Sequence, residues 1–531
     1  MLTLASPLLA SCGSGNGGGG GSRNVPGPPP FTSIPLVRVS PTSTLAAGCN
    51  GAQTGTLYLD AEVEPSVALN PTSPANLIGA WQQDRWSNGG AQGLMLGASF
   101  DGGQSWTVSS APFSRCTGGN AGNAGDFERA TDPWVTFSPN GTAYALSLSF
   151  SGGTLQPGSS SAMLVARSID GGLTWSAPTT LIRDGDQFFN DKGTITADNT
   201  DPRFVYAVWD RLNMSSDGPI WMARTVDGGA TWEPARDIYE AGLGNQTIGN
   251  QIVVLPGSAL VNIFAEIDVI ARVGIFMSIR AIRSSDHGDT WSAPVTIAEL
   301  LALGATDPDT GAPVRDGSDV PAVAVDSSGM IYVAWQDARF SDGQRDAIAI
   351  SRSTDGGITW STPVRVNADA ATTAFSPTVR VRGDGVIGVT YYDFRNNTAD
   401  RATLPTDYWI ALSTDALTFR ESHLSGPFDL DSAPDAGGLF LGDYQALASN
   451  GSDFLPFFVQ TNAGGVGNRT DVFVGFARML PTAQAERALS GESVAVVAPP
   501  VQMTTEWRQR VHDRIVRRLE RRVPDWAERH R

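Results

Sequence analysis

Ionisable side chains stand just ahead of a series of short apolar segments, at points where connecting loops would gather them at one end of a fold. They are Glu64, Asp132, Asp191, Lys192, Asp319 and Tyr444, with Arg129 close to the second of them. Two carboxyl groups in one pocket can act as general acid and general base when burial raises the pKa of one of them. The same pair would suit a glycosidase, in which the separation of the carboxylates decides between retention and inversion. Asp132, Asp191 and Asp319 are therefore candidate acid/base residues.

A second series combines an aromatic residue, an aspartate and an arginine. It reads Trp81-Gln-Gln-Asp84-Arg85, Trp209-Asp210-Arg211, Trp335-Gln-Asp337-Ala-Arg339 and Tyr392-Asp393-Phe-Arg395. One interpretation is local: each aspartate pairs with its neighbouring arginine and braces a loop, while the tryptophan fills space between sheets. The other is a ring of arginines that binds a carboxylate-bearing sugar through bidentate contacts. The formal charge of −17 favours a concentrated cationic patch if the ligand is an anion.

Lys192 is the one lysine among 37 basic residues, and the other 36 are arginines. A point charge or a proton carrier at this position is one explanation. Chance retention of a single lysine is the other, and the sequence leaves both open.

Several classes of chemistry are disfavoured. The four histidines (His287, His423, His512 and His530) are scattered, so we expect no zinc site. For the same reason a Ser-His-Asp triad is disfavoured, and no phosphate-binding glycine loop stands out, so no cofactor is expected. Acidic residues outnumber basic ones, 54 to 37, which argues against nucleic-acid binding. No apolar run approaches the ~18 residues of a membrane-spanning helix.

The elements that would position these residues belong to a repeat. The motif Ser/Thr-X-Asp-X-Gly-X-Ser/Thr-Trp recurs with its aspartate at Asp101, Asp170, Asp227, Asp286 and Asp355, and in decayed form at Asp415. In such a turn the carboxylate accepts hydrogen bonds from backbone N–H and hydroxyl groups, the glycine permits a positive φ, and the tryptophan packs between sheets. We call these the Asp turns and expect their carboxylates to be structural.

Each repeat of about 60 residues reads as four short strands. The first strands begin near Glu64, Thr131, Lys192, Asn250, Val320, Ser376 and Tyr444. These seven starts predict an all-β fold, a seven-bladed β-propeller of four-stranded antiparallel blades over residues 34–480. The last repeat lacks a fourth strand, and we expect residues 34–40 to supply it from the other terminus, which removes an exposed edge. The Asp turns then lie on one face, and the candidate site lies on the other.

The Asp-turn motif resembles the Asp-box (BNR) repeat of the sialidase superfamily, over roughly residues 34–480. The resemblance implies a tyrosine nucleophile polarised by a glutamate, an aspartate acid/base and three arginines that grip a substrate carboxylate. Tyr444 and Glu64 would be neighbours once the ring closes and would suit the nucleophile pair. The substrate-binding candidates are Trp81, Arg85, Arg129, Lys192, Trp209, Arg211, Arg339 and Arg395. The family's Phe/Tyr-Arg-Ile-Pro segment is absent, and the family's catalytic domain has six blades.

Two functions follow as expectations. The first is an exported sialidase-like glycoside hydrolase, of the exo-α-sialidase type or a related glycan-cleaving kind, with its site at the channel mouth opposite the Asp turns. The alternative is a non-catalytic cell-surface propeller that binds a glycan or a protein. In either case we expect a monomer whose partner is a glycan or glycoconjugate.

The N-terminal residues indicate export. Residues 1–12 are apolar and end in Leu9-Ala10-Ser11-Cys12, which resembles the lipobox of bacterial lipoproteins and makes Cys12 the candidate for lipidation. Residues 13–33 are a glycine-rich and then proline-rich tether. We therefore expect a protein of the bacterial cell envelope, lipid-anchored and facing the periplasm or exterior, or secreted. An ordinary apolar N-terminus with a stray cysteine is the alternative.

The remaining cysteines, Cys49 and Cys116, form an even pair, which in an exported protein predicts one disulfide. Two unpaired buried thiols are the other interpretation.

The C-terminal residues form a separate element. Residues 481–503 read as a linker, and residues 504–531 read as a basic amphipathic helix with Trp507, Val511, Ile515 and Leu519 on one face. We expect this helix to dock on the acidic body, and a membrane-surface or partner-binding helix is the alternative.

Overall fold

The computed structural model describes residues 31–33, 35–270, 274–465, 467–479, 494–495 and 503–522. Cys12, most of the predicted tether and linker, and residues 523–531 lie outside the described residues, so those predictions are untested. Within the described ranges the chain is built mostly from β-strands, and α2 (Thr505–Arg522) is the one α-helix. This helix is not apolar enough to cross a membrane, and the described residues contain no other candidate.

The strands form consecutive antiparallel units. The units are β4 (Val63–Leu69), β5 (Leu77–Trp86), β6 (Ala91–Ser99) and β7 (Thr107–Ser109); β8 (Arg129–Phe137), β9 (Ala143–Ser151), β10 (Ser160–Ser168) and β11 (Thr179–Asp184); β12 (Phe188–Ala197), β13 (Val205–Asn213), β14 (Ile220–Thr225) and β15 (Arg236–Tyr239); β16 (Gln246–Val254), β17 (Leu260–Ile270), β18 (Gly274–Ser284) and β19 (Val295–Glu299); β21 (Ala322–Val325), β22 (Ile331–Asp337), β23 (Ala347–Ser353) and β24 (Val364–Arg365); β25 (Ala374–Val381), β26 (Ile387–Asp393), β27 (Pro405–Ser413) and β28 (Phe419–Asp429); and β30 (Ala446–Ser449), β31 (Asp453–Thr461) and β32 (Thr470–Val474).

Shorter elements complete the pairing. β2 (Val37–Arg38) pairs with β32, and β1 (Phe31–Ser33) pairs with β33 (Ala477–Met479), which also pairs with β31. β3 (Leu57–Tyr58) pairs with β5, and β34 (Val494–Ala495) pairs with β28. β20 (Val314–Arg315) and β29 (Leu439–Phe440) form a parallel pair. Three short 3₁₀ segments are Arg115–Thr117, Ala338–Phe340 and Leu430–Ser432.

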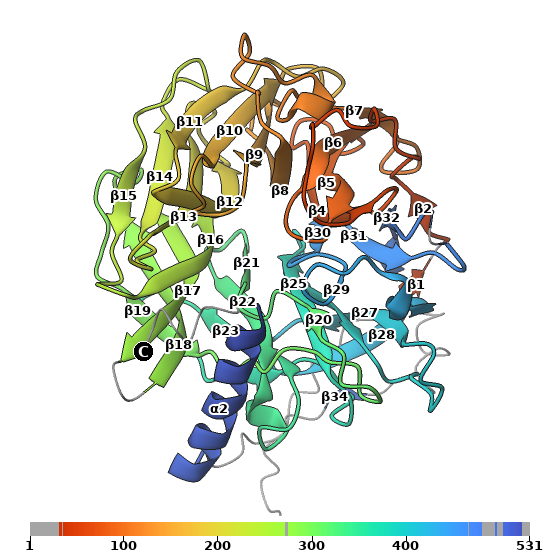
Figure 1. Cartoon of the computed structure of the whole chain (residues 1–531). Helices are drawn as coiled ribbons and strands as arrows, with labels where there is room; N and C mark the ends of the chain where they lie inside the picture. The colour runs from red at the N-terminus through yellow and green to blue at the C-terminus, as the bar shows by residue number, and fades with distance from the viewer. Residues whose placement is uncertain are drawn as a thin grey trace, which may run out of the picture.

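The first strands of the units, which we call the inner strands, surround a common centre (Figure 1). They are β4, β8, β12, β16, β21, β25 and β30. Each contacts the next in chain order, and β30 contacts β4. Residues from all of them line a central channel with a cavity volume of about 420 Å³. The sheets are therefore arranged in a ring.

The two ends of the ring are joined by the N-terminal segment, as predicted for residues 34–40. Val37 pairs with Val474, and the backbone N–H of Val39 donates to the carbonyl oxygen of Val472 at 2.8 Å. The Arg38 guanidinium adds an ion pair with Asp471 at 2.7 Å. A segment distant in sequence thus covers what would be an open strand edge.

The Asp turns have the hydrogen bonds expected of them. Asp101 Oδ1 accepts from the Ser99 hydroxyl and from the backbone N–H of Ser105, both at 2.9 Å. Equivalent bonds occur at Asp170, Asp227, Asp286 and Asp355. At Asp227 such hydrogen bonds lower the carboxyl pKa to about 2. These carboxylates stabilise the turns through hydrogen bonds, so their role is structural.

Helix α2 docks on the body, as one of the two interpretations predicts. Trp507, Val511 and Ile515 are buried in one apolar cluster with residues of the β16–β19 and β21–β24 units. The Leu519 side chain is outside the described part. Arg508 pairs with Glu299, so charge and apolar contact both hold the helix.

Candidate functional site

A repeated irregularity of the inner strands brings ionisable side chains together. In β4, β8 and β12 the register with the following strand slips next to Glu64, Asp132 and Lys192. These residues have φ values of 54°, 52° and 49°, in the left-handed region that non-glycine residues seldom occupy. Bulges of this kind redirect a side chain, and strained backbone is often found at functional sites. Here the three side chains meet.

Lys192 lies at the centre of this cluster and is 9% exposed. Its ammonium Nζ is 2.7 Å from Asp443 Oδ2, 3.3 Å from Asp132 Oδ1 and 3.6 Å from Glu64 Oε1. The backbone N–H of Lys192 also donates to Asp132 Oδ2 and to Asp191 Oδ1, each at 3.0 Å. One lysine therefore joins carboxylates from three inner-strand regions.

Arg315 of β20 is a second cation at the cluster. Its Nε and Nη2 donate to the two carboxylate oxygens of Asp443 at 3.0 and 2.5 Å. The guanidinium also lies over the Phe440 ring, 4.6 Å from its centroid. Asp443 is thus shared between Arg315 and Lys192.

Arg85 contacts the cluster from β5. Its guanidinium lies over the same Phe440 ring at 4.8 Å, and its Nη1 donates to Gln82 Oε1 at 2.8 Å. The Gln82 amide in turn donates to Glu64 and to the Thr131 hydroxyl. Arg85 Nε has no hydrogen-bond partner among the described residues. Burial and the nearby Arg315 lower the Arg85 pKa to about 10.

The carboxyl groups of the cluster have very different proton affinities. Burial, with the charges of Asp132 and Asp443, raises the pKa of Glu64 to about 8 against the opposing effect of Lys192. Burial and Asp132 raise the pKa of Asp191 to about 7. Although burial alone would raise it, Lys192 and hydrogen bonds from Glu64 and Asp191 lower the pKa of Asp132. Near neutral pH the cluster therefore contains an ionised Asp132, a mostly protonated Glu64 and an Asp191 that is partly protonated.

This cluster opens into a cavity of about 510 Å³, which we call the mouth cavity. Its lining includes Arg85, Arg129, Asp132, Asp191, Lys192 and Arg315. Asp191 is partly exposed, whereas Asp132 is buried. In the β5–β6 ladder, Gln82, which contacts Glu64, pairs with Leu94, while Leu77 pairs with Ser99 beside the Asp turn. The mouth cavity and the Asp turns are consequently at opposite ends of the strands, as predicted.

Tyr444 is placed differently from the predicted nucleophile. It lines the central channel, its ring lies 5.2 Å from Trp134, and its hydroxyl donates to the Pro133 carbonyl oxygen at 3.1 Å. Burial and the nearby carboxylates, Glu64 first, raise its pKa well above the ordinary value. The expected proximity to Glu64 is present, since the backbone N–H of Asp443 donates to Glu64 Oε1 at 3.3 Å. The phenol is nevertheless oriented to a backbone carbonyl and is hard to ionise, which does not suit a nucleophile.

Three of the predicted substrate-binding arginines pair with aspartates. Arg211 pairs with Asp184 at 2.6 Å, Arg339 with Asp337 at 2.7 Å and Arg395 with Asp393 at 2.6 Å. Arg211 and Arg395 also lie over the aromatic rings of Phe188 and Trp409 at 3.6 and 3.7 Å. Arg339 and Arg395 thus pair with the neighbouring aspartate, as in the local interpretation. Arg211 instead pairs across to Asp184 of the preceding unit, β8–β11.

The predicted tryptophans are also structural. Trp81 and Trp209 are fully buried in apolar clusters. The Trp209 indole donates to Asn190 at 2.8 Å, and that of Trp81 donates to Gln83 at 3.0 Å. Neither is among the described residues that line the mouth cavity.

Sequence reasoning placed Asp319 in the site and omitted Arg315. Asp319 is buried, and it does not appear in the described lining of the mouth cavity. Arg315 directly precedes the segment Asp316–Asp319, which leads into the inner strand β21. This position in the sequence was the signal that could have identified Arg315 as a site residue. Asp210, the cross-strand partner of Asp191, was read as the local half of an Asp-Arg pair, yet its Oδ1 has no hydrogen-bond partner within the described part of the chain.

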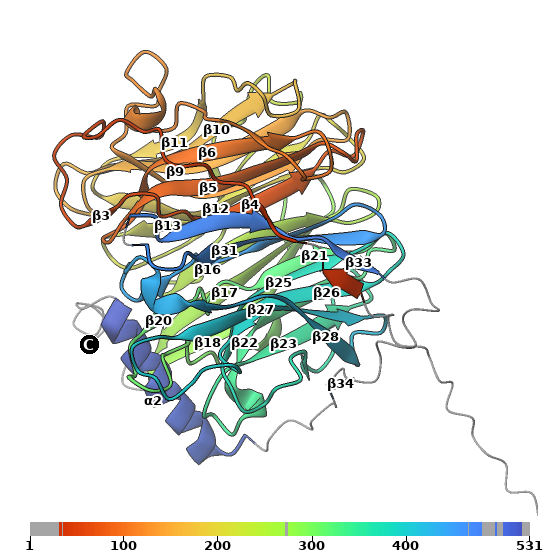
Figure 2. The same cartoon turned by 90° about the vertical axis from the view of Figure 1, so that its right-hand side faces the viewer.

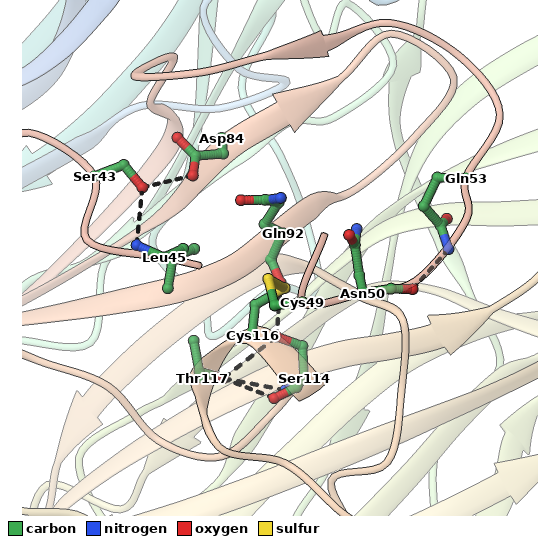
Figure 3. The surroundings of a disulfide bond; sticks show 10 residues. All are labelled: Ser43, Leu45, Cys49, Asn50, Gln53, Asp84, Gln92, Ser114, Cys116 and Thr117. Carbon is green, nitrogen blue, oxygen red and sulfur yellow. Dashed lines mark hydrogen bonds between the residues drawn. A yellow bond between two sulfur atoms is a disulfide. The ribbon is translucent and has the colours of Figure 1, made fainter. Parts of the chain in front are cut away.

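One wall of the mouth cavity is fixed by Arg129 and a disulfide. Arg129 donates to Gln53 Oε1, Asn88 Oδ1 and the carbonyl oxygens of Gly89 and Thr54, at 2.6–2.9 Å. With its donors occupied in this way, Arg129 holds the wall together. Cys49 and Cys116 form the predicted disulfide, with Cys116 in the 3₁₀ segment Arg115–Thr117 (Figure 3). The Gln53 amide donates to the carbonyl oxygen of Asn50, which follows Cys49 in the chain.

Replacing both Cys49 and Cys116 with serine should lower the free energy of unfolding by about 2–4 kcal/mol. The disulfide closes a long loop and so restricts the conformations of the unfolded chain, and the variant loses that restriction. Urea denaturation of the two proteins measures this difference. A reducing agent should destabilise the native chain and leave the double variant unchanged. Equal midpoints for native and variant chains would show that the disulfide is not needed for stability.

No family model and no curated protein matches the chain. Solved structures with some similarity include an α-L-arabinofuranosidase from Fusarium graminearum, with 14% identity over 68% of this chain and 92% of that one, at a TM-score of 0.42. A protein of unknown function from Dyadobacter fermentans has 13% identity over 85% and 100%, at 0.45. A sialidase from Trypanosoma rangeli has 12% identity over 86% and 60%, at 0.41. Similarity at this level does not identify an activity.

Proposed function

We propose that this chain is a seven-bladed β-propeller that cleaves glycans hydrolytically, with its active site in the mouth cavity. The observation that carries the proposal is the set of carboxyl groups around Lys192, which differ sharply in proton affinity and of which Asp132 and Asp191 line one cavity. Enzymes that cleave glycosidic bonds commonly use a pair of carboxyl groups whose environments make their pKa values differ, so that one is protonated and the other is ionised.

Asp191 is the proposed general acid. It is partly exposed at the cavity, and its raised pKa keeps a proton available near neutral pH for the leaving oxygen of the glycoside. Asp132, which remains ionised beside Lys192, is the proposed second carboxylate, acting as base or nucleophile. Lys192 and Arg315 compensate the charges of Asp132 and Asp443.

An anionic sugar, as in the exo-α-sialidase reaction, is the narrower form of this proposal. Arg85 supports it, because this buried guanidinium lines the mouth cavity and its Nε lacks a hydrogen-bond partner among the described residues. A substrate carboxylate would provide that partner and form a charge-assisted hydrogen bond. The pairing of Arg211, Arg339 and Arg395 with aspartates means that the proposed carboxylate contact depends on Arg85 and Arg315, not on the arginines of the other units.

We also propose that the chain is exported and lipid-anchored at the bacterial cell envelope, acting as a monomer. The Cys49–Cys116 disulfide supports export, since disulfides persist in oxidising compartments. Metabolic labelling with a clickable fatty acid tests the anchor, and Cys12→Ala should abolish the label. A Cys12→Ala chain that still carries the label would contradict the assignment of Cys12.

A panel of fluorogenic glycosides tests the proposed activity. It should contain α-sialosides, uronides, arabinofuranosides and neutral hexosides, each incubated with the native chain and with Asp191→Asn. The proposal expects turnover of at least one member by the native chain and its loss in the variant. No turnover of any member would favour the alternative, a non-catalytic propeller that binds a glycan or protein, and binding of the unhydrolysed panel would then be measured.

Tyr444→Phe separates this mechanism from one with a tyrosine nucleophile. Because its hydroxyl donates to Pro133 and not into the mouth cavity, the variant should retain kcat within about tenfold and lose about 0.5–1.5 kcal/mol of stability with the hydrogen bond. Initial rates on the active glycoside measure the first quantity and urea denaturation the second. A loss of kcat of several thousandfold in a folded Tyr444→Phe chain would restore tyrosine as the nucleophile.

A further inference from the structure

Helix α2 lies on the same side of the ring as the mouth cavity. Figure 2 shows it beside β20, and Figure 1 shows its C-terminal end directed toward the centre of the ring. Backbone contacts hold it there: the N–H of Ile275 donates to His512 Nε2 at 2.9 Å, and Arg514 Nη1 donates to the Gly343 carbonyl oxygen at 2.7 Å. The helix is therefore docked with its last turns near the loops that form the site.

Arg518, in those last turns, is 5% exposed and extends into the body. Its Nη1 donates to the Ser318 hydroxyl, and its Nη2 is 3.9 Å from Met277 Sδ. A Cβ added at Gly304 would lie 2.9 Å from Arg518 Cδ and 3.7 Å from Asp316 Oδ2. The arginine stem and the Asp316 carboxylate thus flank the same glycine.

Two buried carboxylates surround this position. Asp316 Oδ2 accepts from the backbone N–H of Ala305 at 2.6 Å and from the Gln336 amide at 2.8 Å. Asp346 accepts from the backbone N–H groups of Leu303 and Gly304 at 2.8–3.0 Å. Arg518 supplies positive charge beside them, which matters because a buried carboxylate without charge compensation is costly.

The turn that follows Asp316 makes close backbone contact with Asp443. Gly317 has a φ of 59°, and a Cβ added there would lie 1.8 Å from the Asp443 carbonyl oxygen. Arg315, on the other side of Asp316, forms the bidentate pair with the Asp443 carboxylate. The segment 315–318 therefore holds Asp443 by backbone and side chain together, and Asp443 in turn holds Lys192 at 2.7 Å.

We propose that Arg518 of helix α2 is a positioning residue for the mouth cavity. Through Ser318 and the carboxylate of Asp316 it holds segment 315–318 where Arg315 and Gly317 fix Asp443 against Lys192. Its effect on catalysis rests on the proposed function, whereas its effect on the structure of the cavity does not. In this proposal, helix α2 helps to position residues of the mouth cavity.

Hydrogen exchange on the full chain tests the placement without any substrate. Arg518→Met should speed exchange about 2- to 30-fold in peptides covering 314–319 and 439–445, the range expected for coupling through a contiguous network. The matched control is Arg514→Met on the same helix. Arg514 donates to the carbonyl oxygens of Gly343 and Gln344 and not to segment 315–318, so this variant should leave exchange in both peptides unchanged. Faster exchange confined to α2 and 314–319, with 439–445 unchanged, would overturn the proposal.

Two further variants keep the test decisive. Gly317→Ala leaves α2 intact and should speed exchange at both 314–319 and 439–445, because its added methyl group clashes with the Asp443 carbonyl. Arg518→Lys keeps the charge and should restore much of the native protection. If the native chain cleaves a panel glycoside, Arg518→Met should also shift the pH above which kcat falls. Arg514→Met should leave that pH unchanged. If no glycoside is cleaved, the exchange result still supports or overturns the positioning role by itself.

Discussion

Asp191→Asn should lower kcat for a cleaved glycoside about 10²- to 10⁴-fold, the usual contribution of a positioned general acid. The amide cannot release a proton to the leaving oxygen, while its size and hydrogen-bonding pattern remain close to those of the carboxyl group. KM should change much less than kcat, because the proposed proton transfer stabilises the transition state and not the bound substrate. Initial-rate kinetics on native and variant chains measure both parameters.

The pH dependence of the same reaction gives an independent check. Asp191 must be protonated to act, and its pKa lies at about 7. The kcat of the native chain should therefore fall as pH rises above about 7, and the Asp191→Asn chain should lose this alkaline limb. Asp186→Asn is the matched control, since Asp186 accepts from Gln187 and Gly158 outside the cluster and should keep the native profile. An Asp191→Asn chain with native kcat would remove Asp191 from the mechanism.

Lys192→Met should lower the free energy of unfolding by about 3–5 kcal/mol, the cost of removing one partner from a buried ion pair. The variant leaves the ionised Asp132 without its ammonium partner and leaves Asp443 paired with Arg315 alone. Guanidinium denaturation with constant m-value measures the change. Glycoside hydrolysis should also fall, because the pKa of Asp132 would rise when the cation that lowers it is removed.

The control for Lys192→Met is Arg203→Met, which removes an exposed arginine paired with Asp201 and should leave the free energy of unfolding nearly unchanged. Adding Asp132→Asn to Lys192→Met should recover part of the lost stability, since the neutral amide needs no cation. The coupling between the two sites follows from the double-mutant cycle. Additive effects of the two substitutions would contradict the proposed pairing.

The ring of inner strands, the pairing of its ends and the face that carries the candidate site could be predicted from the sequence. The Asp turns recur with enough regularity to mark the third and fourth strands, and the missing fourth strand of the last repeat pointed to residues 34–40. Glu64, Asp132, Asp191 and Lys192 could also be predicted as site residues, because each stands where the chain enters the inner strand of a repeat. Each of these signals is local in the chain, which is why sequence reasoning could recover it.

The contacts that could not be predicted from the sequence depend on side-chain orientation. Tyr444 stands at the correct crossing, yet its side chain follows the inner strand into the channel and finds Pro133. Arg211 and Arg395 follow aspartates in the same pattern as Arg85, but Asp184 of the preceding unit holds Arg211, and Asp393 of its own unit holds Arg395. Arg85 differs because Asp84 is engaged elsewhere, accepting from Ser43 at 2.6 Å, and because Phe440 from a distant segment lies beneath its guanidinium. Long-range partners of this kind leave no trace in a single repeat.

A crystal structure of the Asp191→Asn chain soaked with its own uncleaved glycoside tests the central claim most directly. The account predicts the sugar in the mouth cavity, with the scissile oxygen within hydrogen-bonding distance of the residue 191 side chain. A glycoside bound in the central channel or over the Asp turns, with the mouth cavity holding solvent alone, would contradict it.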